Sequence, residues 1–238
     1  MTLVEIWLYS LAAKQTEISS LAKVLSEDER ARAKKFAHAD HGKRFIVGRA
    51  RMRQILSGAI DLPPEHLQFS VTSTGKPFLS NETPQHPHFN LSHTADTAAL
   101  AICNTAEVGV DIEAIRPLRD GFARRFFTKQ EADEIDSLPE EQRLDALVRC
   151  WTRKEAYLKA TGAGIAHGLA SFQVSVKPDE PAKVLAIDGG RHTADAWDLH
   201  DFSPAPEIAG AAAVRAPDGA EFRVIEFSPD GSISNGNR

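Results

Sequence analysis

Three carboxylate side chains in two short segments could hold a metal cation. Residues 108–113 read Val-Gly-Val-Asp-Ile-Glu, which is typical of a buried strand, and strand alternation places Asp111 and Glu113 on one face. In the helix predicted at 140–161, the apolar stripe follows the helical repeat, and Glu155 takes an inward position in it. Three convergent carboxylates repel one another unless a cation lies among them, and an oxygen-only ligand set favours Mg²⁺.

The same residues have a simpler interpretation. Asp111 and Glu113 would then lie on a solvated sheet face, and Glu155 would pair with Lys159 one helical turn further on. Taken alone, either segment favours this simpler interpretation over the metal site. The choice depends on the rest of the sequence.

The carboxylates require a strand and a helix that face each other, and the sequence predicts both. Capping boxes are expected to begin helices after Ser26 and Thr128, and Gly162 is expected to end the long helix. The predicted elements are a strand at 3–9, a basic helix after Ser26, a helix at 43–57 that ends at Gly58, strands at 89–92, 97–103 and 108–113 in a meander, and the helix at 140–161.

The last third of the sequence repeats a pattern of helices followed by three strands. Its apolar runs lie at 196–202, 208–214 and 221–227. We therefore predict an internal duplication, with an asymmetric active site because the motifs Asn-Leu-Ser-His and Asp-Ile-Glu occur only in the first copy. The predicted division is an N-terminal α+β half at 1–107, a C-terminal α+β half at 108–228 and a flexible tail at 229–238.

Composition and charge narrow the classes of partner. The 238 residues are 42% hydrophobic, which is ample for a core, and the net charge is −5. From Arg30 to Arg53 there are nine Lys or Arg residues and one acidic residue, Asp40, which favours a polyphosphate ligand or an acidic protein partner. The net negative charge of the chain and the lack of aromatic residues among these basic residues argue against nucleic acid as a ligand. Cys103 and Cys150 lack metal-ligand spacing, so no redox role is expected.

The sequence also predicts a cellular location. The N-terminal residues show neither a basic leader nor the apolar core of a signal peptide. No run approaches the roughly 18 apolar residues of a membrane span. We therefore expect a cytoplasmic protein that does not enter a membrane.

Five motifs occur in order between Gly75 and Gly164, and the likeness that they carry covers roughly residues 26–175. Each motif is common by itself, but five in this order and spacing are not. Together they resemble the 4′-phosphopantetheinyl transferases, in particular the surfactin-synthetase-activating (Sfp-like) group. The motifs are Gly75-Lys76-Pro77, Phe89-Asn-Leu-Ser-His93, Val108-Gly-Val-Asp-Ile-Glu113, Arg125-Phe-Phe-Thr-Lys-Gln-Glu131, and Trp151-x-x-Lys-Glu-x-x-x-Lys159 with Gly162 and Gly164.

The resemblance implies an activity and a fold. The activity is transfer of the 4′-phosphopantetheine arm of coenzyme A to a serine of an apo acyl or peptidyl carrier protein. The serine hydroxyl would attack the β-phosphate directly, and adenosine 3′,5′-bisphosphate would leave. The fold would be α+β, with two pseudo-symmetric α/β halves and the active site in the cleft between them. Mg²⁺ would be held by Asp111, Glu113 and Glu155.

Further site residues follow from the same resemblance. Glu155 would also accept the proton of the serine, Lys154 and Lys159 would neutralise pyrophosphate charge, and His93 would assist at the phosphate. Taken alone, His93 is more often a structural histidine and Lys76 an exposed turn lysine. The residues that would contact the nucleotide and its phosphates are Arg32, Arg44, Lys76, Pro77, Ser92, His93, Lys154 and Lys159.

Three positions have alternatives that the sequence leaves open. Glu29 occupies a position where some relatives carry a basic residue; here it resembles a helix cap, so the phosphate contact would be absent or supplied by Arg30. Glu131 either only caps its helix or also supports the site. Arg124 and Arg125 either contact an acidic carrier protein or form a solvated helix end.

Two other functions compete with the transferase. One is a non-catalytic module that binds carrier proteins or coenzyme A, but the three carboxylates and Lys159 are intact. The other is a coenzyme A pyrophosphate hydrolase, which would need residues reserved for a positioned water. Two repeats in one chain further predict a monomer, because a single chain then forms the site between the halves.

Overall fold

The structure is a computed structural model that describes residues 1–84, 86–163, 168–178, 180–188, 190, 193–228 and 233–235. Gly164, which belongs to one of the motifs, lies outside this range. The helices are α1 (Gln15–Leu21), α2 (Glu27–Lys34), α3 (Ala39–Ile60), α4 (Phe122–Phe126), α5 (Lys129–Ser137) and α6 (Glu140–Thr161). The strands are β1 (Thr2–Ser10), β2 (Phe69–Val71), β3 (Pro77–Leu79), β4 (His88–Thr94), β5 (Thr97–Cys103), β6 (Val108–Ala114), β7 (Phe172–Val174), β8 (Val184–Ile187), β9 (Trp197–Ala205), β10 (Ile208–Arg215), β11 (Ala220–Phe227) and β12 (Ile233–Asn235).

Two units with the same topology follow one another in this α+β fold. Each unit contains a strand, a long helix and a hairpin, namely β1, α3 and β4–β5, then β6, α6 and β9–β10. In both units the second hairpin strand pairs antiparallel with the first strand, which gives the orders β1-β5-β4 and β6-β10-β9. The predicted duplication is therefore present, but each repeat begins with a strand. The predicted meander is wrong at its third strand, because β6 pairs with β10 of its own unit.

The end of the chain joins the second unit to the first. Strand β11 pairs in parallel with β1, so the five-stranded sheet has the order β12-β11-β1-β5-β4. Of the predicted tail, the structure describes Ile233–Asn235, which pairs with β11. The predicted division at residue 107 stays a prediction. Strand β11 belongs to the second half of the sequence, but it pairs with β1 in the sheet of the first unit.

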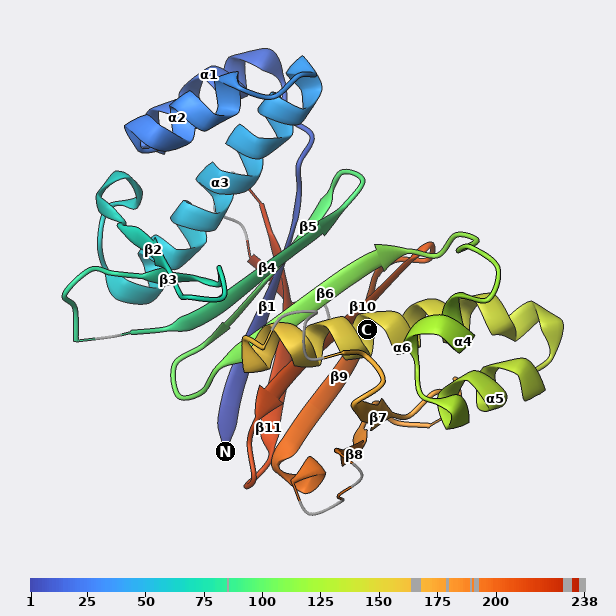
Figure 1. Ribbon diagram of the computed structural model, residues 1–238. Helices are drawn as coiled ribbons and strands as arrows, with labels where there is room; N and C mark the ends of the chain where they lie inside the picture. The colour runs from blue at the N-terminus through green and yellow to red at the C-terminus, as the bar shows by residue number, and fades with distance from the viewer. Residues whose placement is uncertain are drawn as a thin grey trace.

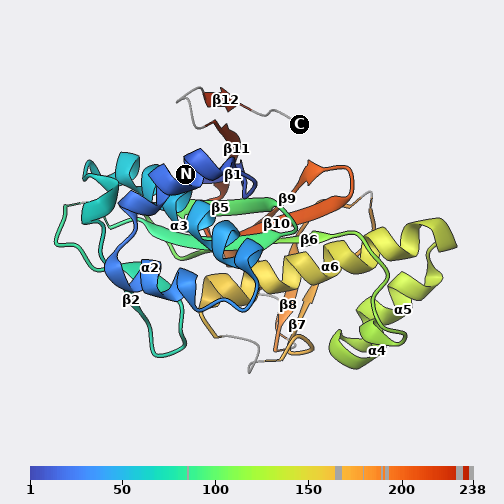
Figure 2. The ribbon, with the colours of Figure 1, turned by 90° about the horizontal axis from the view of Figure 1, so that it is seen from above.

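The fold has four layers, two of helix and two of sheet, because alternating side chains give each sheet two apolar faces. Helix α3 covers one face of the five-stranded sheet, the two sheets face each other, and α6 covers the outer face of the three-stranded sheet (Figures 1 and 2). Along β5, Leu100 and Ile102 pack with Met52 of α3, whereas Ala99 and Ala101 share the other core with β1, β6 and β10. No helix in the described part of the chain is both long and apolar enough to cross a membrane.

The helix caps follow the sequence signals closely. Ser26 and Thr128 are the N-caps of α2 and α5, and both capping boxes are complete. Helix α6 ends before Gly162, whose φ of 68° is left-handed. Helix α3 is longer than predicted: it passes through Gly58, because an exposed glycine costs a helix only about 1 kcal/mol, and ends at Ile60, before the left-handed residue Asp61.

Candidate active site

The site begins where α6 lies directly on β6. A Cβ atom at Gly109 would lie 2.0 Å from the carbonyl oxygen of Ala156 and 2.4 Å from the amide nitrogen of Ala160. Only glycine allows this approach, and a glycine inside a strand is the sequence signal for it. Asp111 is two residues further along β6, so its side chain faces the same helix.

Replacement of Gly109 by alanine is expected to destabilise the fold by about 1–3 kcal/mol, because α6 must move away from β6. The transfer rate should fall in parallel, since that helix carries Glu155 and Lys159. Gly58→Ala is the matched control. It has open space around its Cβ position in α3, so alanine there should stabilise by about 0.5–1 kcal/mol. Denaturant unfolding of both variants measures this, and equal free energies of unfolding would contradict the close approach.

The structure brings the three predicted carboxylates together. Asp111 and Glu155 are buried and Glu113 is half-buried. Burial, and next the charge of Asp111, raise the pKa of both Glu113 and Glu155 above the ordinary carboxyl value. Asp111 and Glu113 share one face of β6, and this face contacts the part of α6 that carries Glu155 and Lys159. Their role as metal ligands stays a prediction.

Two oxygens of this group have no protein partner. Oδ2 of Asp111 and Oε1 of Glu155 are buried and accept no hydrogen bond. Buried carboxylate oxygens are normally satisfied, so these two fit a cation that binds through oxygen. Among the described residues, however, no three His, Cys, Asp or Glu side chains are already arranged to hold a metal ion. The other oxygen of Asp111 is instead bound to Lys159.

Lys159 and Ser92 complete the contacts of Asp111. Nζ of Lys159 lies 2.6 Å from Oδ1 of Asp111, and it also donates to the Ser92 hydroxyl at 3.2 Å and to the Val110 carbonyl at 3.3 Å. The Ser92 hydroxyl in turn donates to the same Oδ1 at 2.8 Å. Three elements, β4, β6 and α6, therefore meet at one carboxylate oxygen.

Asn90 is a site residue that the sequence reasoning missed. Its Oδ1 accepts a hydrogen bond from the Val110 amide at 2.9 Å, and the Ile112 amide donates to the Ser92 hydroxyl at 3.4 Å. These side chains of β4 join β6 across the boundary of the two sheets. The signal was present in the sequence, because Asn90 and Ser92 are two residues apart and share a strand face.

Three of the predicted nucleotide contacts, His93, Arg44 and Arg32, lie around α2, α3 and the β4–β5 turn, apart from the carboxylates. His93 follows Ser92 but points to the opposite face of β4, and it is exposed. Arg44 forms an ion pair with Asp96 in that turn at 2.6 Å. The Arg32 guanidinium lies over the Phe45 ring at 5.2 Å. Their predicted phosphate contacts stay predictions.

Lys154 does not face the carboxylates. Its ammonium is completely buried, donates to the carbonyls of Leu169 and Phe172 at 2.7 Å each, and pairs with Oε1 of Glu131 at 2.8 Å. All three of its hydrogens are thus used inside the protein. The structure therefore does not support the predicted contact of Lys154 with pyrophosphate, and its role here is structural.

Glu131 and Glu29 are capping residues with further partners. Glu131 completes its capping box, accepts a hydrogen bond from the Val174 amide and pairs with Lys154, so it organises the core behind the site. Glu29 caps α2 and binds Arg49 and Arg53. Burial raises the pKa of Glu29, but the hydrogen bond from Arg53 and the charge of Arg49 outweigh this and hold the pKa below its ordinary value.

Arg30, Arg124 and Arg125, which were candidates for contacts with phosphate or with a carrier protein, all have partners within the protein. Arg30 donates to the Leu25 carbonyl, and Arg124 is paired with Asp133 and Asp136. The Arg125 guanidinium lies over the Phe126 ring. Its side chain lines a cavity of about 460 Å³ with Leu118, Arg119, Asp120, Phe122 and Phe126.

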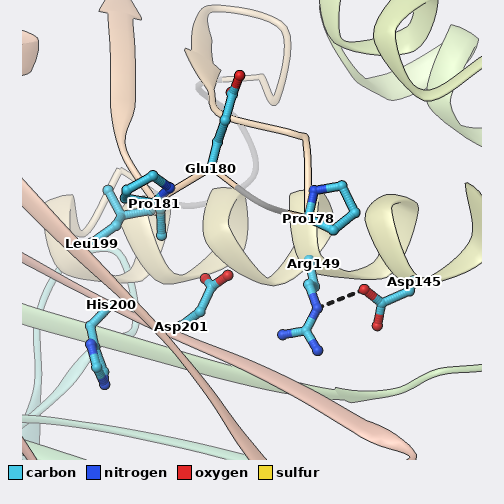
Figure 3. A pocket seen from close by; sticks show the side chains of 9 residues that line it. Asp145, Arg149, Pro178, Glu180, Pro181, Leu199, His200 and Asp201 are labelled. Carbon is cyan, nitrogen blue, oxygen red and sulfur yellow. Dashed lines mark hydrogen bonds and ion pairs between the residues drawn. The ribbon is translucent and has the colours of Figure 1, made fainter. Parts of the chain in front are cut away.

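A larger cavity of about 500 Å³ is lined by residues of α6, of β9 and of the segment before β8. Figure 3 shows its wall, in which Arg149 and Asp145 form an ion pair at 2.7 Å. Asp201, also in the wall, is held by Arg153. None of the predicted site residues lines this cavity, so the carboxylate group is distinct from it.

Comparison with known proteins supports one family. The model of the "4'-phosphopantetheinyl transferase superfamily" matches residues 107–213, and that of the "4'-phosphopantetheinyl transferase, N-terminal" matches residues 11–105. The 4'-phosphopantetheinyl transferase HetI of Nostoc sp. is 39% identical over 89% of this chain and 87% of its own length. The 4'-phosphopantetheinyl transferase psf-1 of Bacillus pumilus is 33% identical over 86% of this chain and 85% of its own length.

Among solved structures, the holo-[acyl-carrier-protein] synthase of Thermotoga maritima matches with a TM-score of 0.39 and 16% identity, over 52% of this chain and 71% of that chain. The family assignment does not depend on this likeness. It rests on the two family models, which together extend over most of the chain, and on the two long relatives. The chain therefore belongs to the 4′-phosphopantetheinyl transferase superfamily.

Proposed function

We propose that this protein transfers the 4′-phosphopantetheine arm of coenzyme A to a serine of an apo acyl or peptidyl carrier protein, and that adenosine 3′,5′-bisphosphate is released. The observation that supports this best is the convergence of Asp111, Glu113, Glu155 and Lys159 where α6 contacts β6. Family membership gives the class of reaction. This arrangement supplies carboxylates that can bind a cation and an ammonium group, and such charges stabilise the transition state of a phosphoryl-type transfer.

Mg²⁺ is the metal that the ligand set favours. Asp111, Glu113 and Glu155 would hold it, because their charges act on one another and two of their buried oxygens lack a hydrogen-bond partner. When bound, the ion would neutralise charge on the pyrophosphate of coenzyme A. A bound cation would give the two unpartnered oxygens a ligand, and this is the structural reason to expect Mg²⁺ binding.

The side chains themselves perform positioning and charge stabilisation. Lys159 pairs with Asp111, its side chain is 28% exposed, and it would stabilise the departing phosphate. Burial and the charge of Asp111 raise the pKa of Glu155, which favours proton acceptance from the serine hydroxyl, while a bound cation acts in the opposite direction. No covalent enzyme intermediate is required, and both cysteines are buried away from this chemistry.

Intact-mass spectrometry of an apo carrier protein tests the proposal. Incubation with this protein, coenzyme A and Mg²⁺ should add the mass of one phosphopantetheine group. The gain should disappear with EDTA and in the Glu155→Ala variant, while Lys23→Met, which changes an exposed lysine, should behave like wild type.

Other outcomes would contradict the transferase. Binding of coenzyme A without any mass gain, across acyl and peptidyl carriers, would favour the non-catalytic module. Consumption of coenzyme A without a carrier protein would favour the hydrolase. A gain that survives EDTA would contradict the metal requirement alone.

A further inference from the structure

Lys76 occupies an unusual position for a turn lysine. Its side chain is only 12% exposed, and its Nζ lies 2.5 Å from Oε2 of Glu107. The same ammonium donates to the Val108 carbonyl at 3.1 Å and, more weakly, to the Ala160 carbonyl at 3.4 Å. Three acceptors satisfy the three hydrogens of the ammonium, so in this arrangement none is directed to a ligand.

Two of these acceptors belong to the elements that carry the site. Val108 is the first residue of β6, three residues before Asp111. Ala160 directly follows Lys159 in the last turn of α6, where helix carbonyls lack intrahelical partners and favour a cation. Lys76 therefore reaches from the first unit to the end of α6 in the second.

The turn that holds Lys76 is itself braced. The Thr72 amide donates to the Lys76 carbonyl at 2.9 Å, and the Lys76 amide donates to the Thr72 hydroxyl at 3.0 Å. The Gly75 amide also donates to the Thr72 carbonyl. Such a turn presents the lysine in one direction, and a fixed donor loses less entropy when it binds its acceptors.

The contact lies at the same end of α6 as the close approach at Gly109. There the backbone of Ala156, Lys159 and Ala160 touches β6, and the Lys159 ammonium reaches Asp111 and Ser92. A shift of this last turn would move Lys159 relative to its partners. Misplacement by about 1 Å can cost a reaction about 100-fold.

We propose that Lys76 is a positioning residue: it fixes the C-terminal turn of α6 against β6 and so places Lys159 beside Asp111. The resemblance implied that the motif at residues 75–77 borders the adenosine, whereas this role acts on the reacting end of the site. Glu107 would orient the ammonium, with His88 at 2.9 Å from its other oxygen. The inference rests on the proposed transferase function.

Steady-state kinetics separates positioning from nucleotide binding. Lys76→Met should lower kcat by about 10- to 100-fold and leave the KM for coenzyme A within about twofold. Lys76→Arg should recover most of kcat, because a guanidinium can donate to the same acceptors. Glu107→Gln should lower kcat by less than Lys76→Met, also without a change in KM. A raised KM with unchanged kcat in Lys76→Met would overturn the proposal.

Hydrogen exchange gives a readout that does not depend on activity. In Lys76→Met, the backbone amides of the last turn of α6, residues 158–162, should exchange faster than in wild type, whereas the exposed-lysine control Lys23→Met should leave them unchanged. Unchanged exchange in Lys76→Met would overturn the proposal even if the protein proved inactive as a transferase. Faster exchange without transfer activity would contradict only the proposed function.

Discussion

Replacement of Lys159 by methionine is expected to slow phosphopantetheine transfer by about 100- to 1,000-fold and, at the same time, to strengthen the binding of Mg²⁺ to the protein alone. The first effect follows from the proposed role of Lys159, which is to stabilise charge on the departing phosphate. The second follows from geometry, because the Lys159 ammonium lies 2.6 Å from Oδ1 of Asp111, where it would compete with the proposed Mg²⁺ for this carboxylate.

Two measurements check this prediction separately. The rate is measured at saturating coenzyme A and carrier protein. Metal binding is measured without either, as the rise in unfolding temperature with added Mg²⁺ or Mn²⁺, which should be larger in Lys159→Met than in wild type. Lys23→Met serves as the matched lysine control. An unchanged metal effect would contradict the competition, and an unchanged rate would contradict the role at the leaving group.

Removal of either member of the Glu131–Lys154 pair is expected to destabilise the protein by about 3–5 kcal/mol. Both side chains are fully buried, with the charged atoms 2.8 Å apart, so each single change leaves an unpaired charge out of water. Glu131 also caps α5 and accepts a hydrogen bond from the Val174 amide, so its replacement should lower the free energy of unfolding further.

Denaturant unfolding of Glu131→Gln, Lys154→Met and the double variant measures this cost. The double variant should lose less than the sum of the single losses, because it leaves no lone charge. Lys129→Met is the control, since Lys129 pairs with Asp133 at an exposed position and should change stability by less than about 1 kcal/mol. A loss from Lys154→Met no larger than that of the control would contradict the structural role of Lys154.

The predicted phosphate contact of Lys154 comes from the family resemblance, and the sequence does not show which groups surround this side chain. Neighbours on a helix point about 100° apart, and the helical repeat alone does not say which direction leads to the site. The partners of Lys154 are the carbonyls of Leu169 and Phe172, just before and at the start of β7, and the carboxylate of Glu131 in α5, so they come from two separate segments. A resemblance carries over residue positions, but these partners are known only once the chain has folded.

Signals that act within a few residues did predict the structure. The capping boxes at Ser26 and Thr128 and the glycine after residue 161 set the helix ends, because backbone groups at helix ends need local partners. Alternation along β6 correctly placed Asp111 on the face toward α6, because the side-chain direction of a strand follows from its backbone.

By itself, then, the sequence determined the family, the main helices and which faces of β6 and α6 carry carboxylates, since these depend on motifs and on short-range periodicity. The tertiary structure alone decided that β11 pairs with β1, that Asn90 and Ser92 join the two sheets, and that Lys76 holds the end of α6. Each of these contacts joins segments far apart in the chain. No local pattern specifies such partners, because their energy comes from groups that meet only when both units have folded.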